Sequence, residues 1–411
     1  MKDPLETTET VDTRRAILVA VLVALGLVFV VLARPSIAVT VALIIGLIVT
    51  VMLHEAGHMI AAKHSGMKVT EFFVGFGPRI WSFRRGETEY GVKAIPAGGY
   101  VRILGMNNVE EVDPEDEART YRAASFPKRL VTVLAGIGVN LLIAFLLVFG
   151  VLFRVGEPAG NTTTIAAVSE DLPAAAAGLR DGDRVVSING TRIDDWEDIP
   201  AVLESHAGDE ISIVVDRDGQ SRALSVTPTR RSTDDGRGFI GIAPETARVS
   251  LGPVGALRES GVLMWDGTTA TVNGIYRVFS PAGVERQARD VTRAGPQPSV
   301  PRGVNLERPR SVIGIVSIGD DLVQGDVWTL LFLFATINLF LALFNLIPLL
   351  PFDGGHAAIA CYEAVVSRIR GREVRIDYRR MLPVTVMVFA VLLFVGGSAI
   401  FLDLREIVTG S

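Results

Sequence analysis

Long apolar runs with few charges, rather than short periodic stripes, set the hydrophobic pattern of this chain. They occupy residues 16–33, 37–62, 129–153, 327–350 and 381–403. A helix needs about 20 apolar residues to cross about 30 Å of hydrocarbon. Each run therefore predicts a transmembrane helix, and the fourth helix together with the Asp-Gly motif that follows it makes up residues 327–360. The fold class that follows is a multi-span α-helical membrane protein.

Residues 1–36 allow two interpretations. Arg14 and Arg15 precede the first apolar run and Val31-Leu32-Ala33 ends it, as in a secretory signal peptide. The run is long for such a peptide, however, and the next apolar run begins only a few residues later. We therefore expect a cytoplasmic N-terminus followed by a retained transmembrane helix.

The charges between the apolar runs predict the orientation of the chain. The loop at 63–128 and the segment 368–380 are rich in arginine and lysine, which favour the cytoplasmic side. Residues 154–326 then lie outside the cytoplasm. A single cysteine, Cys361, excludes a disulfide scaffold, and a net charge of −5 provides no basic field that would attract nucleic acid.

Ionisable residues inside the second apolar run carry the candidate chemistry. His54, Glu55 and His58 form an H-E-x-x-H motif, and residues four apart lie on one face of a helix. The two imidazoles can therefore bind one zinc ion, with Glu55 beside the metal-bound water. The alternative, a pair of satisfied core histidines, leaves unexplained why three ionisable groups sit in an apolar helix, where they are costly without a partner.

A catalytic zinc ion normally takes three protein ligands and keeps one position open. Asp353 is the candidate for the third ligand, because it follows the fourth apolar run in a segment that Pro348 and Pro351 break. A helix cap is the alternative role for Asp353, and His356 is a second possible ligand, farther from the break. In the predicted topology, His58 and Asp353 both lie near the inner ends of their helices, and therefore at one depth.

These residues predict peptide hydrolysis. Zinc lowers the pKa of its bound water and polarises the scissile carbonyl. Glu55 takes the proton of the water and passes it to the leaving amine. The predicted enzyme is a zinc metalloendopeptidase that acts near the cytoplasmic face of the bilayer.

The two motifs resemble those of the site-2 protease family of intramembrane zinc metalloproteases. The resemblance is closest to the bacterial RseP type and to its actinobacterial relatives in regulated intramembrane proteolysis. Asn345, Pro348, Asp353 and Gly354 match the second motif of the family, N-x-x-P-x-x-x-L-D-G, with Phe352 in place of leucine. Over residues 37–402, the resemblance implies the helical core of the family in a multi-pass protein of a bacterial plasma membrane.

The resemblance also implies how substrates bind. In the family, a membrane-associated β-hairpin-rich loop, here residues 63–128, offers an edge strand to an unwound substrate. Asn140 lies in a stretch similar to the G-P-x-x-N motif of the family, with Ile137 in place of proline, and interhelical hydrogen bonding is its alternative role. The expected substrates are single-span membrane proteins, such as anti-sigma factors, that have already been cut outside. The substrate-binding residues that the resemblance implies are Asn140, Gly98, Gly99 and Asn345.

Residues 163–229 change to a pattern of short strands and turns. The stretch from Pro173 to Gly190 resembles the PDZ domains of bacterial proteases, with Asn189-Gly190 as a hairpin turn and a helix at 196–205. We expect one extracytoplasmic PDZ domain, which either binds the new C-terminus of a cut substrate or acts as a size gate. Residues 250–326 are then an amphipathic juxtamembrane segment and linker, or a helix pair that packs on the PDZ domain.

Two other functions are compatible with the same residues. A catalytically silent PDZ membrane scaffold would bind partners without cutting them. A metal transporter would move the ion that His54, His58 and Asp353 hold, but transport needs further sites along a path to both faces, and the sequence shows one cluster. We therefore expect a zinc metalloprotease in a lipid bilayer, with no nucleic-acid partner.

Overall fold

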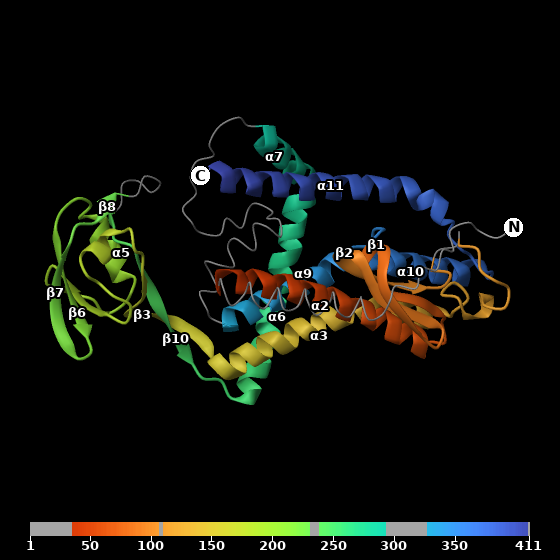
Figure 1. Ribbon diagram of the computed structural model, residues 1–411, viewed down its shortest axis with the longest axis horizontal. Helices are drawn as coiled ribbons and strands as arrows, with labels where there is room; N and C mark the ends of the chain where they lie inside the picture. The colour runs from red at the N-terminus through yellow and green to blue at the C-terminus, as the bar shows by residue number, and fades with distance from the viewer. Residues whose placement is uncertain (1–34, 107–109, 231–237, 293–326, 410–411) are drawn as a thin grey trace. The chain divides into compact units, whose positions relative to one another are not determined.

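The computed structural model describes residues 35–106, 110–230, 238–292 and 327–409. The first predicted transmembrane helix, at 16–33, lies outside the described residues, and so does its retention or cleavage. The described residues fall into two compact units, one built around the apolar helices and one formed by residues 152–257. Figure 1 shows the helices and strands of both.

Within the described residues, four helices are long and apolar enough to cross a membrane. They are α2 (Pro35–His64), α3 (Phe126–Val155), α9 (Val327–Asn345) and α11 (Tyr378–Thr409). Large apolar side chains point outward along them: Leu146 is 54% exposed and Leu393 63% exposed. An apolar outer surface on long helices fits lipid as the solvent, so these helices form the membrane unit.

The segment 327–360 contains two helices, separated by the break that Pro348 and Pro351 predicted. Helix α9 ends at Asn345, and a second helix, α10 (Asp353–Arg370), begins after a segment that contains Pro348 and Pro351. Proline cannot donate the backbone hydrogen bond that a helix interior needs. The segment also folds back tightly, since a Cβ atom on Gly354 would lie 2.2 Å from the carbonyl oxygen of Leu346.

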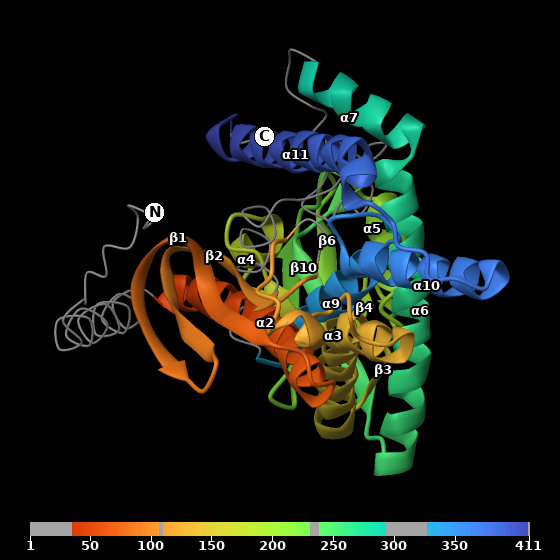
Figure 2. The same cartoon turned by 90° about the vertical axis from the view of Figure 1, so that its right-hand side faces the viewer.

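Two further helices, α6 (Pro253–Phe279) and α7 (Pro281–Thr292), occupy the described part of the predicted juxtamembrane segment. Helix α6 crosses α9 closely, since a Cβ atom on Gly267 would lie 2.8 Å from a methyl group of Leu339. Helix α7 lies beside α11 in both views (Figure 1 and Figure 2), and the side-chain amide of Gln287 donates to the carbonyl oxygen of Val395. Both helices thus pack against apolar helices of the membrane unit.

A curled sheet follows α2, formed by β1 (Val69–Arg85) and β2 (Thr88–Ile103). Both strands are long and bent, so that Phe72 pairs with Tyr90 on one side and with Val101 on the other. The first half of β1 is therefore flanked by both halves of β2, and the second half of β2 lies at an edge of the sheet. Figure 2 shows the sheet curling away from α2. Its base is anchored by buried apolar residues from the sheet, α2, α3 and α10: Ala62, Val69, Ile103, Val133 and Ala357.

The second unit is a β-sheet domain with two short helices. Its main sheet has the strand order β10 (Ile242–Val249), β3 (Glu157–Val168), β4 (Arg184–Ile188), β6 (Ile211–Arg217) and β7 (Gln220–Val226), and β5 (Thr191–Arg192) pairs with β4. Strands β8 (Thr229–Arg230) and β9 (Gly238–Phe239) form a separate pair, and the helices are α4 (Pro173–Ala176) and α5 (Asp198–Glu204). The sheet extends past the expected boundary at 229, because β10 pairs with β3. The expected turn is present, with positive φ angles at Asn189 and Gly190.

A buried ion pair holds one end of this domain together. The Asp183 carboxylate accepts hydrogen bonds from Nε and Nη2 of Arg217, at 2.6 and 2.7 Å, and from the backbone N–H of Arg180. Its side chain is 1% exposed. Burial alone would raise the pKa of Asp183, but the guanidinium and the N–H favour the charged carboxylate and hold the pKa below its usual value.

We expect Asp183→Asn to lower the melting temperature of residues 152–257 at pH 7 by several degrees, since about 1 kcal/mol shifts the melting temperature of such a domain by about 4–8 °C. The folded-state pKa is lowered, so the stabilisation is present above the unfolded-state pKa of about 3.9 and is lost as pH falls through the folded-state pKa. Calorimetry at pH 7 and at acid pH measures both effects. Asp216→Asn is the matched control, because its pair with Arg184 is exposed; equal losses in the two variants would contradict this account.

Candidate metal centre

Helix α2 presents two histidines to the same point. His54 and His58 lie one turn apart, and their Nε2 atoms are 3.1 Å from each other. The rings meet edge to face, with centroids 4.7 Å apart. Both residues are buried, at 6% and 4% exposure. Spacing by four on a helix thus aims both ring nitrogens at one position, as the sequence predicted.

Asp353 completes the cluster from a distant part of the chain. Its Oδ2 atom lies 3.1 Å from Nε2 of His54 and 3.2 Å from Nε2 of His58. Asp353 is the first residue of α10, whose cap position is Phe352 and carries no side-chain cap hydrogen bond. The carboxylate therefore faces the two rings instead of capping its own helix, and the break between α9 and α10 is what allows this.

The three side chains fit a zinc ion. Among the described residues, they are the group of histidine, cysteine and acidic side chains whose donor atoms lie close enough to share a metal, all within 4.8 Å of one another. Tetrahedral zinc with bonds of about 2.0–2.1 Å has ligand atoms about 3.3–3.4 Å apart, and the three observed separations approach that value. Two imidazoles and one carboxylate are a usual ligand set for a catalytic zinc ion with an open position.

Helix α3 supports His58 from behind. Nδ1 of His58 lies 2.8 Å from the backbone carbonyl oxygen of Thr132. A carbonyl only accepts, so Nδ1 carries the proton and Nε2 keeps the lone pair that a metal requires. Gly136 lets α3 approach, since a Cβ atom there would lie 2.3 Å from Nε2 of His58. The sequence did not predict this hydrogen bond, because its acceptor is a backbone carbonyl oxygen, which every residue has.

Glu55 contacts the edge of the sheet. One of its carboxylate oxygens accepts a hydrogen bond of 3.0 Å from the backbone N–H of Val101 in β2. The strand lies directly on α2, because a Cβ atom on Gly99 would be 2.4 Å from the sulfur of Met52. The N–H of Val101 thus points away from β1 and toward Glu55. The acid–base candidate and the edge strand are neighbours, which the sequence alone does not show.

The four expected substrate-binding residues occupy different surroundings. Gly99 packs on α2, and Gly98 next to it has φ +130°. Asn140 lies one turn beyond Gly136 on α3, is 1% exposed, and its Oδ1 has no hydrogen-bond partner among the described residues. Asn345 is half-buried at the end of α9. The structure thus brings Gly99 next to the H-E-x-x-H helix, and the roles of all four residues in substrate binding stay predictions.

The remaining histidines of the chain are engaged elsewhere. Nδ1 of His356 lies 3.3 Å from the hydroxyl of Tyr378. His64 and His206 contact backbone carbonyl oxygens one turn earlier in their own segments. None of the three belongs to the metal cluster found among the described residues. His356 is therefore not the third donor in this arrangement.

A polar contact joins α2 and α9 that the sequence did not predict. The side-chain amide of Asn338, which is 1% exposed, donates to Oγ1 of Thr50 at 3.2 Å. Thr50 lies one turn before His54, so the bond fixes the ligand helix against α9. The signal in the sequence was an asparagine inside an apolar run, where polar side chains commonly join helices.

Comparison with known proteins identifies the chain. The model of peptidase family M50 matches residues 42–393. Zinc metalloprotease Rip1 of Mycobacterium tuberculosis H37Rv is 34% identical over 381 residues, covering 84% of this chain and 91% of the relative. Rip1 of Mycolicibacterium smegmatis is 32% identical over 385 residues, covering 84% and 92%. Among solved structures, the PDZ domain of an SdrC-like protein from Listeria monocytogenes matches with a TM-score of 0.19 and 22% identity, over 21% of this chain and 92% of that domain. On the family match and the two full-length relatives, this chain belongs to peptidase family M50, the site-2 proteases.

Proposed function

We propose that this protein is a zinc-dependent endopeptidase that cuts the transmembrane segments of single-span membrane proteins. The observation that carries the proposal is the convergence of His54, His58 and Asp353, with nitrogen and oxygen donors 3.1–3.2 Å apart. Glu55 follows the first ligand directly in the sequence. Such a constellation within apolar helices serves a substrate that is itself in the membrane.

His54, His58 and Asp353 would hold the metal, and the hydrogen bond from His58 to Thr132 would fix the ring. When bound, zinc supplies Lewis-acid polarisation of the peptide carbonyl and activation of water. Glu55 takes a proton from the attacking water and returns it to the nitrogen of the leaving amine. Burial of the site limits access of bulk water and strengthens each of these electrostatic interactions.

We propose that a substrate binds as an extended strand along the edge of β2. A transmembrane helix hides its carbonyl groups in its own hydrogen bonds, so the segment must open before attack. The N–H of Val101 already points out of the sheet at Glu55, and strand alternation directs the backbone of Gly99 to the same edge. An extended substrate added to this edge would place a carbonyl beside Glu55. Asn140 and Asn345 are then candidates to hold that strand.

The wider assignment follows the same reasoning. We propose that the charged loops around the sheet and after α10 face the cytoplasm, under the positive-inside rule. The β-sheet domain of residues 152–257 would then lie outside as a PDZ domain, reading new C-termini or limiting substrate size. Its short helix α5 and its strand pairing support that fold. Substrates already trimmed outside, such as anti-sigma factors, fit an enzyme of this kind.

Glu55→Gln separates an enzyme from a silent scaffold. We expect the variant to bind zinc like the wild type and to cleave a transmembrane substrate at least about a hundredfold more slowly, because general acid–base catalysis commonly contributes that much or more. The measurement is cleavage in liposomes together with metal analysis of the same samples. Undiminished cleavage by Glu55→Gln would remove the proposed mechanism.

Asp353→Ala tests the third ligand. We expect purified protein to lose stoichiometric zinc, since two imidazoles without the carboxylate bind the ion much more weakly. Metal analysis after dialysis against a mild chelator measures this. His356→Ala is the matched control, since His356 lies on the same helix without joining the cluster, and it should retain zinc. Full zinc content in Asp353→Ala would disprove the ligand set.

A further inference from the structure

We propose that the buried ion pair between Arg129 and Glu363 is a positioning device that sets Asp353 against the two histidines. Neither residue touches the metal cluster. The pair acts through helix α10, which carries Glu363 along its length and Asp353 at its first turn. The inference rests on the proposed role of Asp353 as a zinc ligand.

The pair joins two helices of the membrane unit at a position shielded from solvent. Nη1 of Arg129 on α3 lies 2.7 Å from Oε2 of Glu363 on α10. The two side chains are 8% and 3% exposed. They are 234 residues apart in the sequence, so only the tertiary fold brings them together. At such exposure, the geometry of the pair resists change, because either charge left alone would be strongly unfavourable.

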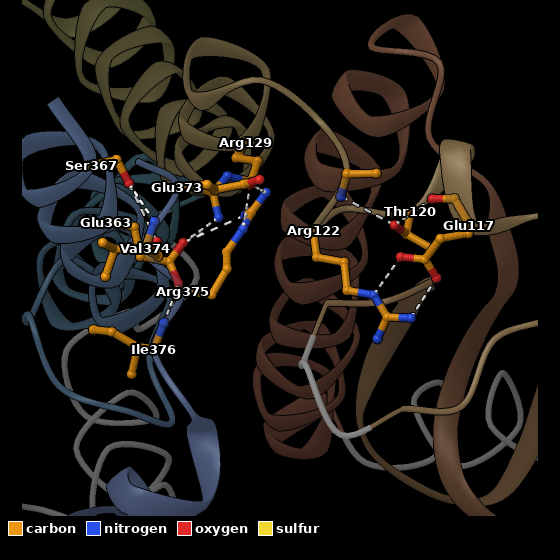
Figure 3. A network of polar contacts seen from close by, with 11 residues as sticks. Glu117, Thr120, Arg122, Arg129, Glu363, Ser367, Glu373, Val374, Arg375 and Ile376 are labelled. Atoms are coloured by element: carbon orange, nitrogen blue, oxygen red, sulfur yellow. Dashed lines mark hydrogen bonds and ion pairs between the residues drawn. The ribbon is translucent and has the colours of Figure 1, made fainter. Parts of the chain in front are cut away.

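The partners of Glu363 complete its hydrogen bonding. Its second carboxylate oxygen, Oε1, accepts from the backbone N–H of Ile376 at 2.7 Å, and Nη1 of Arg375 lies 3.6 Å from Oε2. Figure 3 shows Glu363 at the centre of this network, with Arg129 reaching it from α3. The guanidinium of Arg129 also lies over the ring of Tyr121, 5.8 Å from its centroid. The carboxylate therefore ties α10 to α3 and to the segment that leads into α11.

Helix α3 is in contact with both ligand-bearing helices through one face. Arg129, Thr132 and Gly136 are spaced by three and four residues, so they lie along one side of α3. Thr132 orients His58, Gly136 packs against its ring, and Arg129 holds α10. A single rigid helix thus sets the separation between the histidine helix and the aspartate helix.

The connection between α9 and α10 explains why such a device is needed. Residues 346–352 are not helical, so the orientation of α9 does not determine the orientation of α10. Glu363 lies ten residues after Asp353, about 15 Å along the same helix axis. An ion pair at that distance from Asp353 fixes the tilt of α10. A small change in this tilt would move the Asp353 carboxylate by a large fraction of an ångström. Metal sites tolerate only about 0.5 Å of such displacement.

The test is Glu363→Gln in the full-length protein, with zinc affinity measured by competition with a chromophoric chelator in detergent. Supporting groups around a metal site typically change affinity by about 10–100-fold, so we expect zinc to bind about tenfold or more weakly. Cobalt substitution gives a second readout, in which the visible absorption bands of the variant should shift. Unchanged zinc affinity together with unchanged cobalt bands would overturn the proposal.

Three variants separate positioning from general loss of structure. Glu117→Gln removes the same kind of pair at an exposed position: the bonds of Glu117 to Arg122, also shown in Figure 3, lie within one loop. This variant should leave zinc affinity unchanged. Arg129→Lys keeps the charge and should restore part of the affinity that Arg129→Met loses. Equal zinc loss in Glu117→Gln, or equal affinities in the two Arg129 variants, would indicate a merely structural role.

The Asp353→Ala background distinguishes this inference from the proposed function. If Glu363 acts through Asp353, Glu363→Gln should weaken zinc binding little further once Asp353 is absent, since coupled residues are not additive. A full additional loss in that background would contradict positioning. If Asp353→Ala alone leaves zinc affinity intact, the proposed ligand set fails; if it weakens zinc binding and Glu363→Gln does not, only the positioning inference fails.

Discussion

Buried polar groups inside apolar helices must satisfy one another, and this constraint governs the membrane unit. His54 and His58 lie almost fully enclosed in α2, where ionisable side chains without partners are costly. The Nε2 atoms of both rings converge with the carboxylate of Asp353, and Nδ1 of His58 bonds to the carbonyl oxygen of Thr132. In the proposed site, a zinc ion shared by the three side chains would offset that cost.

Close approach of backbones makes the convergence possible. Gly57 on α2 packs against α3, where a Cβ atom would lie 2.9 Å from the carbonyl oxygen of Ala135. Gly136 faces the ring of His58, and Gly99 brings β2 onto α2. In lipid, helices associate through such packing and through hydrogen bonds, because the hydrocarbon removes the usual hydrophobic driving force between them. Small residues around the site therefore do the work that a large apolar core does in a water-soluble enzyme.

The sequence predicted features that depend on local pattern. Apolar run length located the four described transmembrane helices, and the spacing of His54 and His58 placed both rings on one helix face. Pro348 and Pro351 marked the irregular segment before Asp353, although not that α10 is a separate helix running to Arg370. Each of these features depends on residues close together in the sequence, so residue spacing and the backbone properties of proline are enough to predict it.

Contacts between residues that are distant in the sequence could not be predicted from the sequence. The carbonyl of Thr132 offers no side-chain signal, and nothing links Arg129 with Glu363 before the fold is known. Strand pairing was equally hidden, since β1 pairs with both halves of β2 and β10 joins the sheet of residues 152–257 from beyond the expected domain end. In each case the two partners are far apart in the sequence. Local sequence patterns do not show which distant residues will pair.

The sheet beside α2 follows from the same constraint that shapes the metal site. Peptide hydrolysis needs an accessible carbonyl, and a helix in lipid has none to offer, because every backbone group is bonded within the helix. An opened segment must exchange those bonds for others at the moment of unwinding. The edge of β2 supplies backbone donors and acceptors at the level of Glu55, as the N–H of Val101 shows. In the proposed mechanism, the strand edge would stabilise an extended chain in the membrane, and the metal cluster would cut it.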